Sequence, residues 1–148
     1  MPFQLITRAD WGAQEVEYDC EELQSPVEVV QIVSDTESDH CYTRGECGET
    51  VQEIQKVHIQ QDNLQDINFN FVIGGDGNVY EGRGWKRKVQ QHQNWQTNIC
   101  NNLVIGFVGG DIIANPPSNV VFQAFHEFIV HFAEEGKLSK EKHIEIKM

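Results

Sequence analysis

The sequence predicts an α/β domain in which helices cover a mixed β-sheet. Two observations carry this prediction: short apolar runs rich in β-branched residues recur along the chain, and segments with helical spacing of apolar residues separate them. The chain has 148 residues, which suits one domain with one core, and 39% hydrophobic residues exclude a disordered chain. We therefore expect residues 1–148 to form a single domain.

The first third of the chain predicts a surface segment, a buried strand and a helix. Residues 10–27 are polar and acidic and are expected to run along the surface. Residues 27–33, VEVVQIV, are typical of a buried strand. Thr43 and Glu46 have the spacing of a capping box, so a helix should begin there and run to about Gln61. Its apolar residues at helical spacing are Val51, Ile54 and Val57.

The middle of the chain predicts a hairpin and a further strand. Phe69, Phe71 and Ile73 alternate with polar or smaller residues, as in a half-buried strand. Glycines in the following GGDG supply the positive φ angles of a turn, and residues 79–81 lead back. Residues 102–108, NLVIGFV, predict another buried strand.

The last third predicts a long helix and a final strand. One apolar stripe runs through Val121, Phe125, Phe128 and Phe132. Gly136 is a suitable stop for this helix. Residues 139–142 could form one more helical turn, and residues 143–147, HIEIK, alternate like a strand.

The charge excludes a nucleic-acid partner, because phosphate binding requires clustered positive charge. The formal net charge is −12, and the one basic cluster is Lys86-Arg87-Lys88. No lysine or arginine lies between Arg8 and Arg44, whereas ten acids do: Asp10, Glu15, Glu17, Asp19, Glu21, Glu22, Glu28, Asp35, Glu37 and Asp39. No apolar run approaches the roughly 20 residues of a membrane helix. The opening residues lack the features of a signal peptide, so for a secreted protein this chain would be an excised part.

The four cysteines favour one disulfide. Cys41 and Cys47 are separated by five residues, more than the two to four of a zinc knuckle, so we expect them to be bonded to each other. Cys20 and Cys100 could form a second pair. The same region, IVSDTESDHC, carries residue types that can bind a metal, and without further context it is either a metal site or a solvated loop. These residues are Asp35, Glu37, Asp39, His40 and Cys41.

Several sequence blocks follow one another in a recognisable order: ITRADWGA, the C-x5-C pair, VQEIQKVHIQ, NFNFVIGGDGNVYEGRGW, LVIGFVGG and GKLS. Together they resemble the peptidoglycan recognition protein domain, which is related to N-acetylmuramoyl-L-alanine amidases. The resemblance covers nearly the whole chain and implies a central mixed β-sheet flanked by about three helices, with a groove on one face. It also implies a C-terminally shortened domain, because the chain stops about where a late histidine of the family would begin.

Active members of the family are zinc amidases, and the resemblance implies that this chain is not one. The first zinc-binding histidine falls on Asp35, and the assisting tyrosine falls on Phe69. The late histidine and cysteine ligands are absent. We therefore expect no catalytic residues, no metal and no cofactor. In this reading His58 matches a helix histidine of the family and is expected to be a packing residue.

Non-catalytic members can still bind peptidoglycan in the groove, and the resemblance assigns candidate residues to that role. They are Thr36, Arg83, Trp85, Lys86, Arg87, Gln91 and His92. Val89 and Gln90 stand where many members have small residues, which would narrow the groove. Lys86 and Arg87 could instead attract a carboxylate.

Two functions follow from this resemblance. The favoured one is an innate-immune domain with an impaired groove that pairs with other receptor domains of the family and regulates signalling negatively. The alternative is a peptidoglycan-binding recognition domain. In either case we expect an extracellular location, as the outer part of a membrane-anchored receptor, with no membrane contact by this chain.

Overall fold

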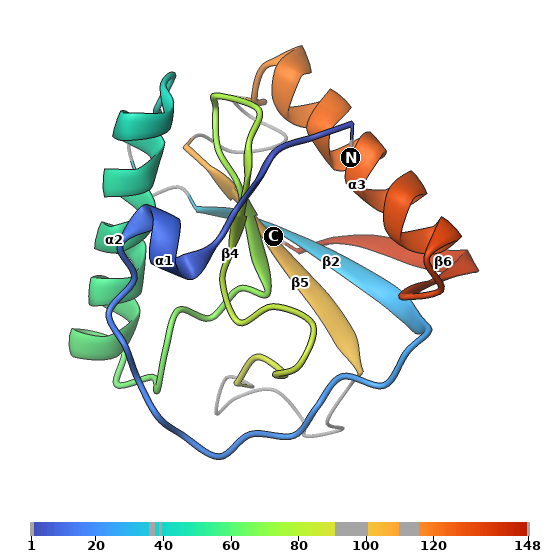
Figure 1. The fold of residues 1–148 in the computed structure, drawn as a ribbon, viewed down its shortest axis with the longest axis horizontal. Helices are drawn as coiled ribbons and strands as arrows, with labels where there is room; N and C mark the ends of the chain where they lie inside the picture. Colours follow the sequence, from blue (N-terminus) through green and yellow to red (C-terminus); the bar gives the residue numbers. More distant parts are fainter. Residues whose placement is uncertain (1, 36–37, 39, 91–100, 110–115, 148) are drawn as a thin grey trace.

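A computed structural model describes residues 2–35, 38, 40–90, 101–109 and 116–147 (Figure 1). Its centre is a six-stranded sheet in the order β1-β4-β3-β5-β2-β6. The strands are β1 (Leu5–Ile6), β2 (Val27–Asp35), β3 (Phe71–Ile73), β4 (Val79–Glu81), β5 (Asn102–Val108) and β6 (Leu138–Lys147). The β3–β4 pair is antiparallel and the other neighbours are parallel, so the sheet is mixed, as predicted.

Helices cover both faces of this sheet, which confirms the predicted α/β class. Among the described residues these are α1 (Arg8–Trp11), α2 (Arg44–Gln60) and α3 (Asn119–Glu134), and Figure 1 shows α2 and α3 on opposite sides of the strands. Alternate residues of β5 supply the two cores. Ile105 belongs to the cluster under α3, and Val104 belongs to the cluster under α2.

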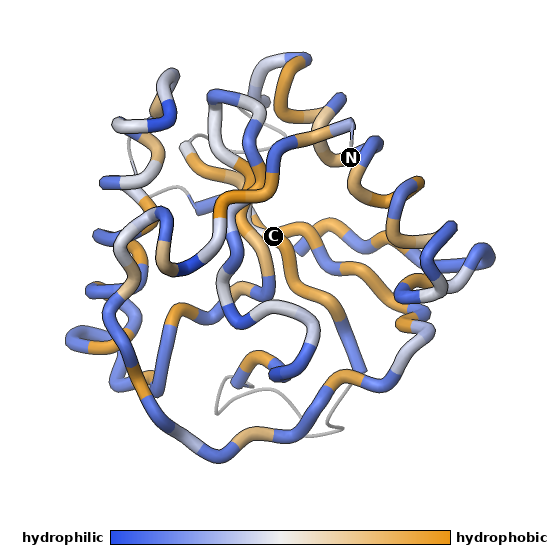
Figure 2. The backbone as a smooth tube through the Cα atoms, viewed as in Figure 1, coloured by the Kyte–Doolittle hydropathy of each residue, from blue (hydrophilic) through white to orange (hydrophobic). Residues whose placement is uncertain are grey.

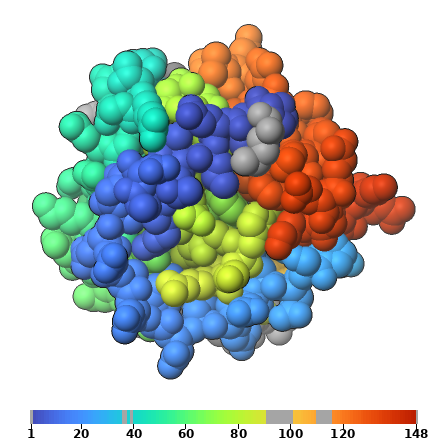
Figure 3. Space-filling view, viewed as in Figure 1, coloured from blue at the N-terminus to red at the C-terminus, as the bar shows by residue number. Residues whose placement is uncertain are grey.

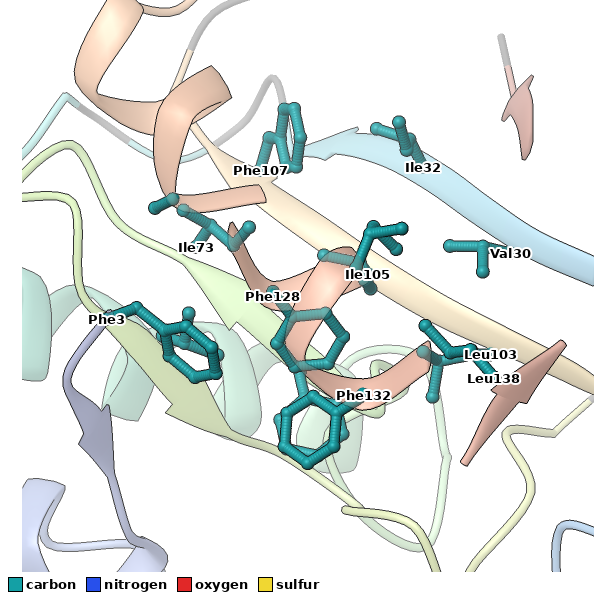
Figure 4. Packing of buried hydrophobic residues seen from close by; sticks show 14 of the residues in the cluster. Phe3, Val30, Ile32, Ile73, Leu103, Ile105, Phe107, Phe128, Phe132 and Leu138 are labelled. Carbon is teal, nitrogen blue, oxygen red and sulfur yellow. The ribbon is translucent and has the colours of Figure 1, made fainter. Parts of the chain in front are cut away.

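The larger cluster is aromatic and lies beneath α3 (Figure 4). The stripe predicted on this helix is confirmed: Phe128 and Phe132 are buried, with ring centroids 4.7 Å apart. Phe128 also contacts Phe71 of β3, with ring centroids 5.1 Å apart. The apolar stripe therefore fixes which face of α3 turns toward the sheet.

The predicted helix start at Thr43 is confirmed, with one change in the cap. The Glu46 amide donates to Thr43 Oγ1 at 3.1 Å, as in a capping box. The carboxylate of Glu46, however, accepts from the amide of Tyr42 rather than that of Thr43, at 3.2 Å. The cap therefore also holds the residue next to Cys41.

Two predictions about strands need correction. The helical turn expected at residues 139–142 is wrong, because these residues belong to β6. Val27 pairs with Leu138 and Val29 pairs with His143. Between these two pairs β6 advances by five residues and β2 by two, and the extra residues of β6 form an irregularity in the ladder. Phe69 precedes β3 instead of lying in it, and all three β3 residues are buried because helices cover both faces of the sheet.

The amino-terminal segment, residues 10–27, runs along the surface as expected up to β2, but two residues before β2 are buried. Figure 2 shows mostly hydrophilic residues in this segment beside the apolar strands. Trp11 and Leu23 are nonetheless buried, and the indole of Trp11 donates to the Glu81 carbonyl at 2.9 Å. No helix among the described residues is long and apolar enough to cross a membrane.

Candidate functional site

A groove of about 420 Å³ lies between α2 and the segment that follows β2. Asp35, the last residue of β2, is at one side of it, with Ser38 and His40 from the next segment. The other wall is the face of α2 from Glu46 to His58. Because β2 is paired on both sides, with β5 and β6, Asp35 is held at a fixed place at the carboxyl end of the parallel strands.

The Cys41–Cys47 disulfide, predicted from the spacing, joins the segment after β2 to the first turns of α2. Both cysteines are buried. The close approach of this loop to the β3–β4 hairpin requires glycine at position 75, where a Cβ would lie 2.0 Å from the Cys41 carbonyl oxygen. The disulfide and this contact together position one wall of the groove.

The groove is acidic. Its described lining contains no lysine or arginine, whereas five carboxylates line it: Asp35, Glu46, Glu49, Glu53 and Asp62. Glu49 and Glu53 are exposed on α2, one turn apart. Such a lining favours cationic groups and disfavours an anionic ligand.

His58 lies at the α2 wall and is more than a packing residue. Its Nδ1 accepts a hydrogen bond from the Asn68 amide at 2.9 Å. Because a backbone N–H can only donate, the neutral ring must carry its proton on Nε2. Burial lowers the pKa of His58 below its usual value, and the carboxylates of Asp35 and Asp62 partly offset this effect. A neutral imidazole therefore lines the acidic groove near neutral pH.

Phe69 lies behind His58 and is buried. The two rings meet edge-on, with centroids 5.4 Å apart. Phe69 has no hydroxyl, so a hydrogen-bond donor is missing where the resemblance places the assisting tyrosine. The position is instead occupied by an apolar ring that supports the groove wall.

The described residues near Asp35 do not supply the ligand set of a catalytic zinc. A catalytic zinc site takes three protein ligands and leaves one position open for water. No group of three or more histidine, cysteine, aspartate or glutamate side chains in the described part of the chain could hold a metal ion. Glu37 and Asp39 lie outside the described residues.

The candidate residues Lys86 and Arg87 lie in a different pocket, of about 660 Å³, which shares no described lining residue with the acidic groove. Figure 3 shows the yellow-green residues of this region between the blue amino-terminal segment and the orange-red residues near 137. Five cations of the eleven in the chain line this pocket: Arg8, Arg83, Lys86, Arg87 and Lys137. The acids Glu15, Glu17 and Glu81 line it too. The chain thus separates its basic pocket from its acidic groove.

Arg83 and Trp85, two other candidates, are engaged by the protein itself. Arg83 is buried; its Nε donates to the Ile67 carbonyl at 2.7 Å, and its guanidinium lies 5.2 Å from the Tyr18 ring. Trp85 stacks on Phe128 with centroids 6.0 Å apart, and its buried Nε1 has no hydrogen-bond partner among the described residues. Thr36, Gln91 and His92, also candidates, lie outside the described residues.

Arg87 is partly engaged as well. Its guanidinium lies over the Tyr18 ring, 4.4 Å from the centroid. Hydrogen bonding to Tyr18 raises the pKa of Arg87, and burial raises the pKa of Tyr18. This contact brings the amino-terminal segment over the basic pocket, so Lys86 is the less restrained cation of the pair.

The sequence reasoning missed Asp66, which organises the segment beside this pocket. Its fully buried carboxylate forms an ion pair with Arg8 at 3.0 Å and accepts hydrogen bonds from the Tyr18 hydroxyl at 2.8 Å and the Gln55 amide at 3.0 Å. A lone aspartate in a polar stretch gives no local signal of burial. Two of these partners, Arg8 and Tyr18, lie far from Asp66 in sequence.

The predicted second cysteine pair remains a prediction. Cys20 forms no disulfide within the described residues, and its thiol donates to the Lys88 carbonyl at 3.0 Å. Cys100 lies outside the described residues.

The architecture and its groove define the chain as a domain of the peptidoglycan recognition fold. The ectodomain of the Drosophila transmembrane receptor PGRP-LCa is similar, with a TM-score of 0.86 and 28% identity, covering 95% of this chain and 83% of that one. Human PGRP-IBETAC, in complex with glycosamyl muramyl pentapeptide, gives a TM-score of 0.82 and 26% identity, covering 95% and 81%. PGRP-LE in complex with tracheal cytotoxin has a TM-score of 0.86 and 27% identity, covering 96% of this chain and 81% of that one.

Curated relatives agree with the structural comparison. Peptidoglycan-recognition protein 2 of Holotrichia diomphalia is 31% identical over 137 residues, which cover 90% of this chain and 68% of the relative. Peptidoglycan-recognition protein 3 of the same organism is 31% identical over 137 residues, covering 93% and 70%. The chain spans about two thirds of the length of these relatives. No family model matches the chain. On these relatives, the chain belongs to the peptidoglycan-recognition protein family.

Proposed function

We propose that this chain is a non-catalytic peptidoglycan-recognition domain of innate immunity that pairs with other receptor domains of its family and restrains their signalling. The similarity to a receptor ectodomain supports an extracellular place for it, as the outer part of a receptor. A domain that occupies a signalling receptor without presenting peptidoglycan would reduce the pool of productive receptor complexes.

The loss of amidase chemistry is part of this proposal. An amidase requires a zinc ion that activates water beside a group able to assist proton transfer. Asp35 and Phe69 stand at the first ligand position and at the tyrosine position suggested by the resemblance. One carboxylate and a phenyl ring supply neither the ligand set nor the hydroxyl, so we expect no cleavage of the muramoyl-alanine amide bond.

The acidic lining of the groove carries the proposal. Stem peptides of peptidoglycan present free carboxylates, which the five carboxylates of the groove would repel without any lining cation among the described residues to offset them. The same lining would attract a lysine- or arginine-bearing surface of another protein. We therefore place the contact with a partner receptor domain at the α2 wall, around Glu49 and Glu53.

The basic pocket favours the alternative, a domain that binds peptidoglycan. Lys86 and Arg87 could hold a stem-peptide carboxylate there, outside the acidic groove. Solved relatives carry such ligands: PGRP-LE is in complex with tracheal cytotoxin, a monomeric diaminopimelic acid-type peptidoglycan. The alternative therefore differs from the main proposal in its ligand, which is peptidoglycan instead of a receptor domain, and in its binding site, which is the basic pocket instead of the α2 wall.

The test compares binding to the PGRP-LCa ectodomain with retention on insoluble peptidoglycan. We expect the chain to bind the ectodomain and Glu49→Lys/Glu53→Lys to lose that binding, because the charge of the groove wall reverses. The matched control Glu22→Lys/Glu134→Lys changes the net charge equally at exposed sites outside the groove and should bind normally.

Three outcomes would overturn the proposal. They are equal loss of ectodomain binding in the control, strong retention of the unmodified chain on peptidoglycan, and release of stem peptides from peptidoglycan in the presence of zinc. If Lys86→Glu/Arg87→Glu abolishes retention on peptidoglycan while Glu49→Lys/Glu53→Lys leaves it intact, the alternative function holds.

A further inference from the structure

Among the described strands, β6 is the edge of the sheet next to β2. It is the last strand in the order β1-β4-β3-β5-β2-β6 and pairs with β2 alone among the described strands. Figure 1 shows it at the margin of the molecule, away from α2, and Figure 3 shows the red residues projecting there. Residues 143–146 are all exposed. Along these four residues, the backbone N–H and C=O groups that point away from β2 can pair with a further strand.

The two faces of β6 differ in chemistry. Ile144 and Ile146 pair with Val30 and Ile32, which lie in the core beneath α3, yet they are 46% and 50% exposed. His143 and Glu145 point to the other face, since side chains alternate along a strand. An apolar row therefore continues from the core to an uncovered edge.

The charges of β6 select a partner and a register. When two copies pair antiparallel about a two-fold axis, one residue faces its own copy, and residues at equal distances on either side face each other. If the two-fold axis passes at Glu141, Lys142 or Glu145, that residue faces its own copy, so two like charges meet at the axis. Centring on His143 opposes Glu141 to Glu145.

Centring on Ile144 is the one register within residues 141–145 that opposes no like charges. Ile144 then faces Ile144 of the second copy. On each side of the axis, His143 of one copy faces Glu145 of the other. Further from the axis, Glu141 of each copy faces Lys147 of the other, and Ile146 of each copy packs beside the aliphatic part of the other copy's Lys142. Lysines on an edge strand usually oppose pairing, but in this arrangement Lys147 faces an acid and no lysine faces another lysine.

We propose that β6 is a self-association surface, on which a second copy of this chain pairs antiparallel with Ile144 at the two-fold axis. The two sheets then join into one, and the exposed isoleucines of both copies lie together. This inference does not depend on the proposed function, because no described residue of β6 lines the acidic groove.

Cysteine crosslinking tests the register directly. Directly opposed residues in paired strands have Cβ atoms within disulfide range, so Ile144→Cys should give a covalent dimer under mild oxidation. Ile146→Cys is the matched control, because its two copies would be separated by four residues, about 14 Å along the strand. Peptide mapping must locate the link at position 144, since Cys20 is also a free thiol among the described residues.

Charge exchange tests the pairing without a crosslink. Glu145→Lys should weaken dimerisation about tenfold in sedimentation experiments, because two favourable cross-strand pairs are lost. The double exchange His143→Glu/Glu145→Lys should restore dimerisation, since an acid at position 143 would then face a base at position 145 of the second copy. An unmodified chain that stays monomeric at high micromolar concentration, equal crosslinking of Ile144→Cys and Ile146→Cys, or no rescue by the double exchange would overturn the proposal.

Discussion

The phenyl ring of Phe69 lies edge-on against the imidazole of His58, with ring centroids 5.4 Å apart. The same phenyl ring also lies against Gly106 of β5, where a Cβ would approach Phe69 Cδ2 to 2.6 Å. Phe69 thus connects the groove wall on α2 to the centre of the sheet. Phe69 is therefore an element of packing.

This contact predicts that Gly106→Ala destabilises the fold. Adding a methyl group to a filled core costs about 1–3 kcal/mol of unfolding free energy, measured by urea denaturation. In a Phe69→Ala background the added methyl group should cost nearly nothing, because the opposing ring is gone. Gly45→Ala is the control, since its Cβ would meet nothing closer than 4.0 Å. An equal cost of Gly106→Ala in both backgrounds would contradict this account.

Reducing the Cys41–Cys47 disulfide should lower the unfolding free energy by about 2 kcal/mol. The bond closes a short loop and so removes conformational freedom from the unfolded chain. Denaturation with and without reductant measures the effect. The variant Cys41→Ala/Cys47→Ala should show no response to reductant. A response of similar size in that variant would assign the effect to another cysteine.

His58 should make the stability depend on pH below about 6.5. Burial lowers the pKa of His58 in the folded state, so the unfolded chain takes up this proton first as the pH falls. The contribution of His58 to the unfolding free energy is complete above pH 6.5, the usual histidine value, and is lost as the pH falls toward the lower folded pKa. Denaturation between pH 7.5 and 5 measures the slope, in roughly half-unit steps.

His58→Gln should flatten this slope, because its amide oxygen can still accept from the Asn68 amide but takes up no proton in this range. The same change at His126, an exposed histidine on α3, is the control. A slope that is unchanged in His58→Gln would show that other groups cause the dependence on pH.

Asp66→Ala should cost about 3–5 kcal/mol of unfolding free energy, because Arg8 loses its ion-pair partner and the Tyr18 hydroxyl loses its acceptor. Limited proteolysis should cut within residues 8–20 sooner than in the unmodified chain. Asp19→Ala, at an exposed aspartate of the same segment, should change stability by less than about 0.5 kcal/mol. A small cost for Asp66→Ala would mean that the segment is held mainly by Trp11.

Local patterns were sufficient for much of the fold. The capping pair at Thr43 and Glu46 located the start of α2, and the β-branched run at 102–108 matched β5 residue for residue. Such signals are local, because a cap or an apolar period involves neighbours within a few residues. The C-x5-C spacing located the disulfide for the same reason.

The helical turn predicted at residues 139–142 failed because a long-range interaction overrode a local one. Ser139–Lys142 have no strong strand pattern of their own. The ladder with β2, beginning at the pair Val27 and Leu138, nevertheless extends β6 through them as an irregularity. Pairing with a strand more than one hundred residues away leaves no trace in the local sequence.

By itself the sequence determined the α/β class, most of the longer elements and the family resemblance, and it led to the expectation that Asp35 and Phe69 stand at zinc-site positions of the family. The tertiary structure decided which charges lie together. It gathers the carboxylates of α2 and Asp35 into one groove and places Lys86 and Arg87 in a separate pocket. It also buries Asp66 against Arg8 and Tyr18, which are distant in sequence, and places β6 at the edge of the described sheet. Electrostatics and edge pairing depend on distances in space, and those distances exist only once the sheet has formed.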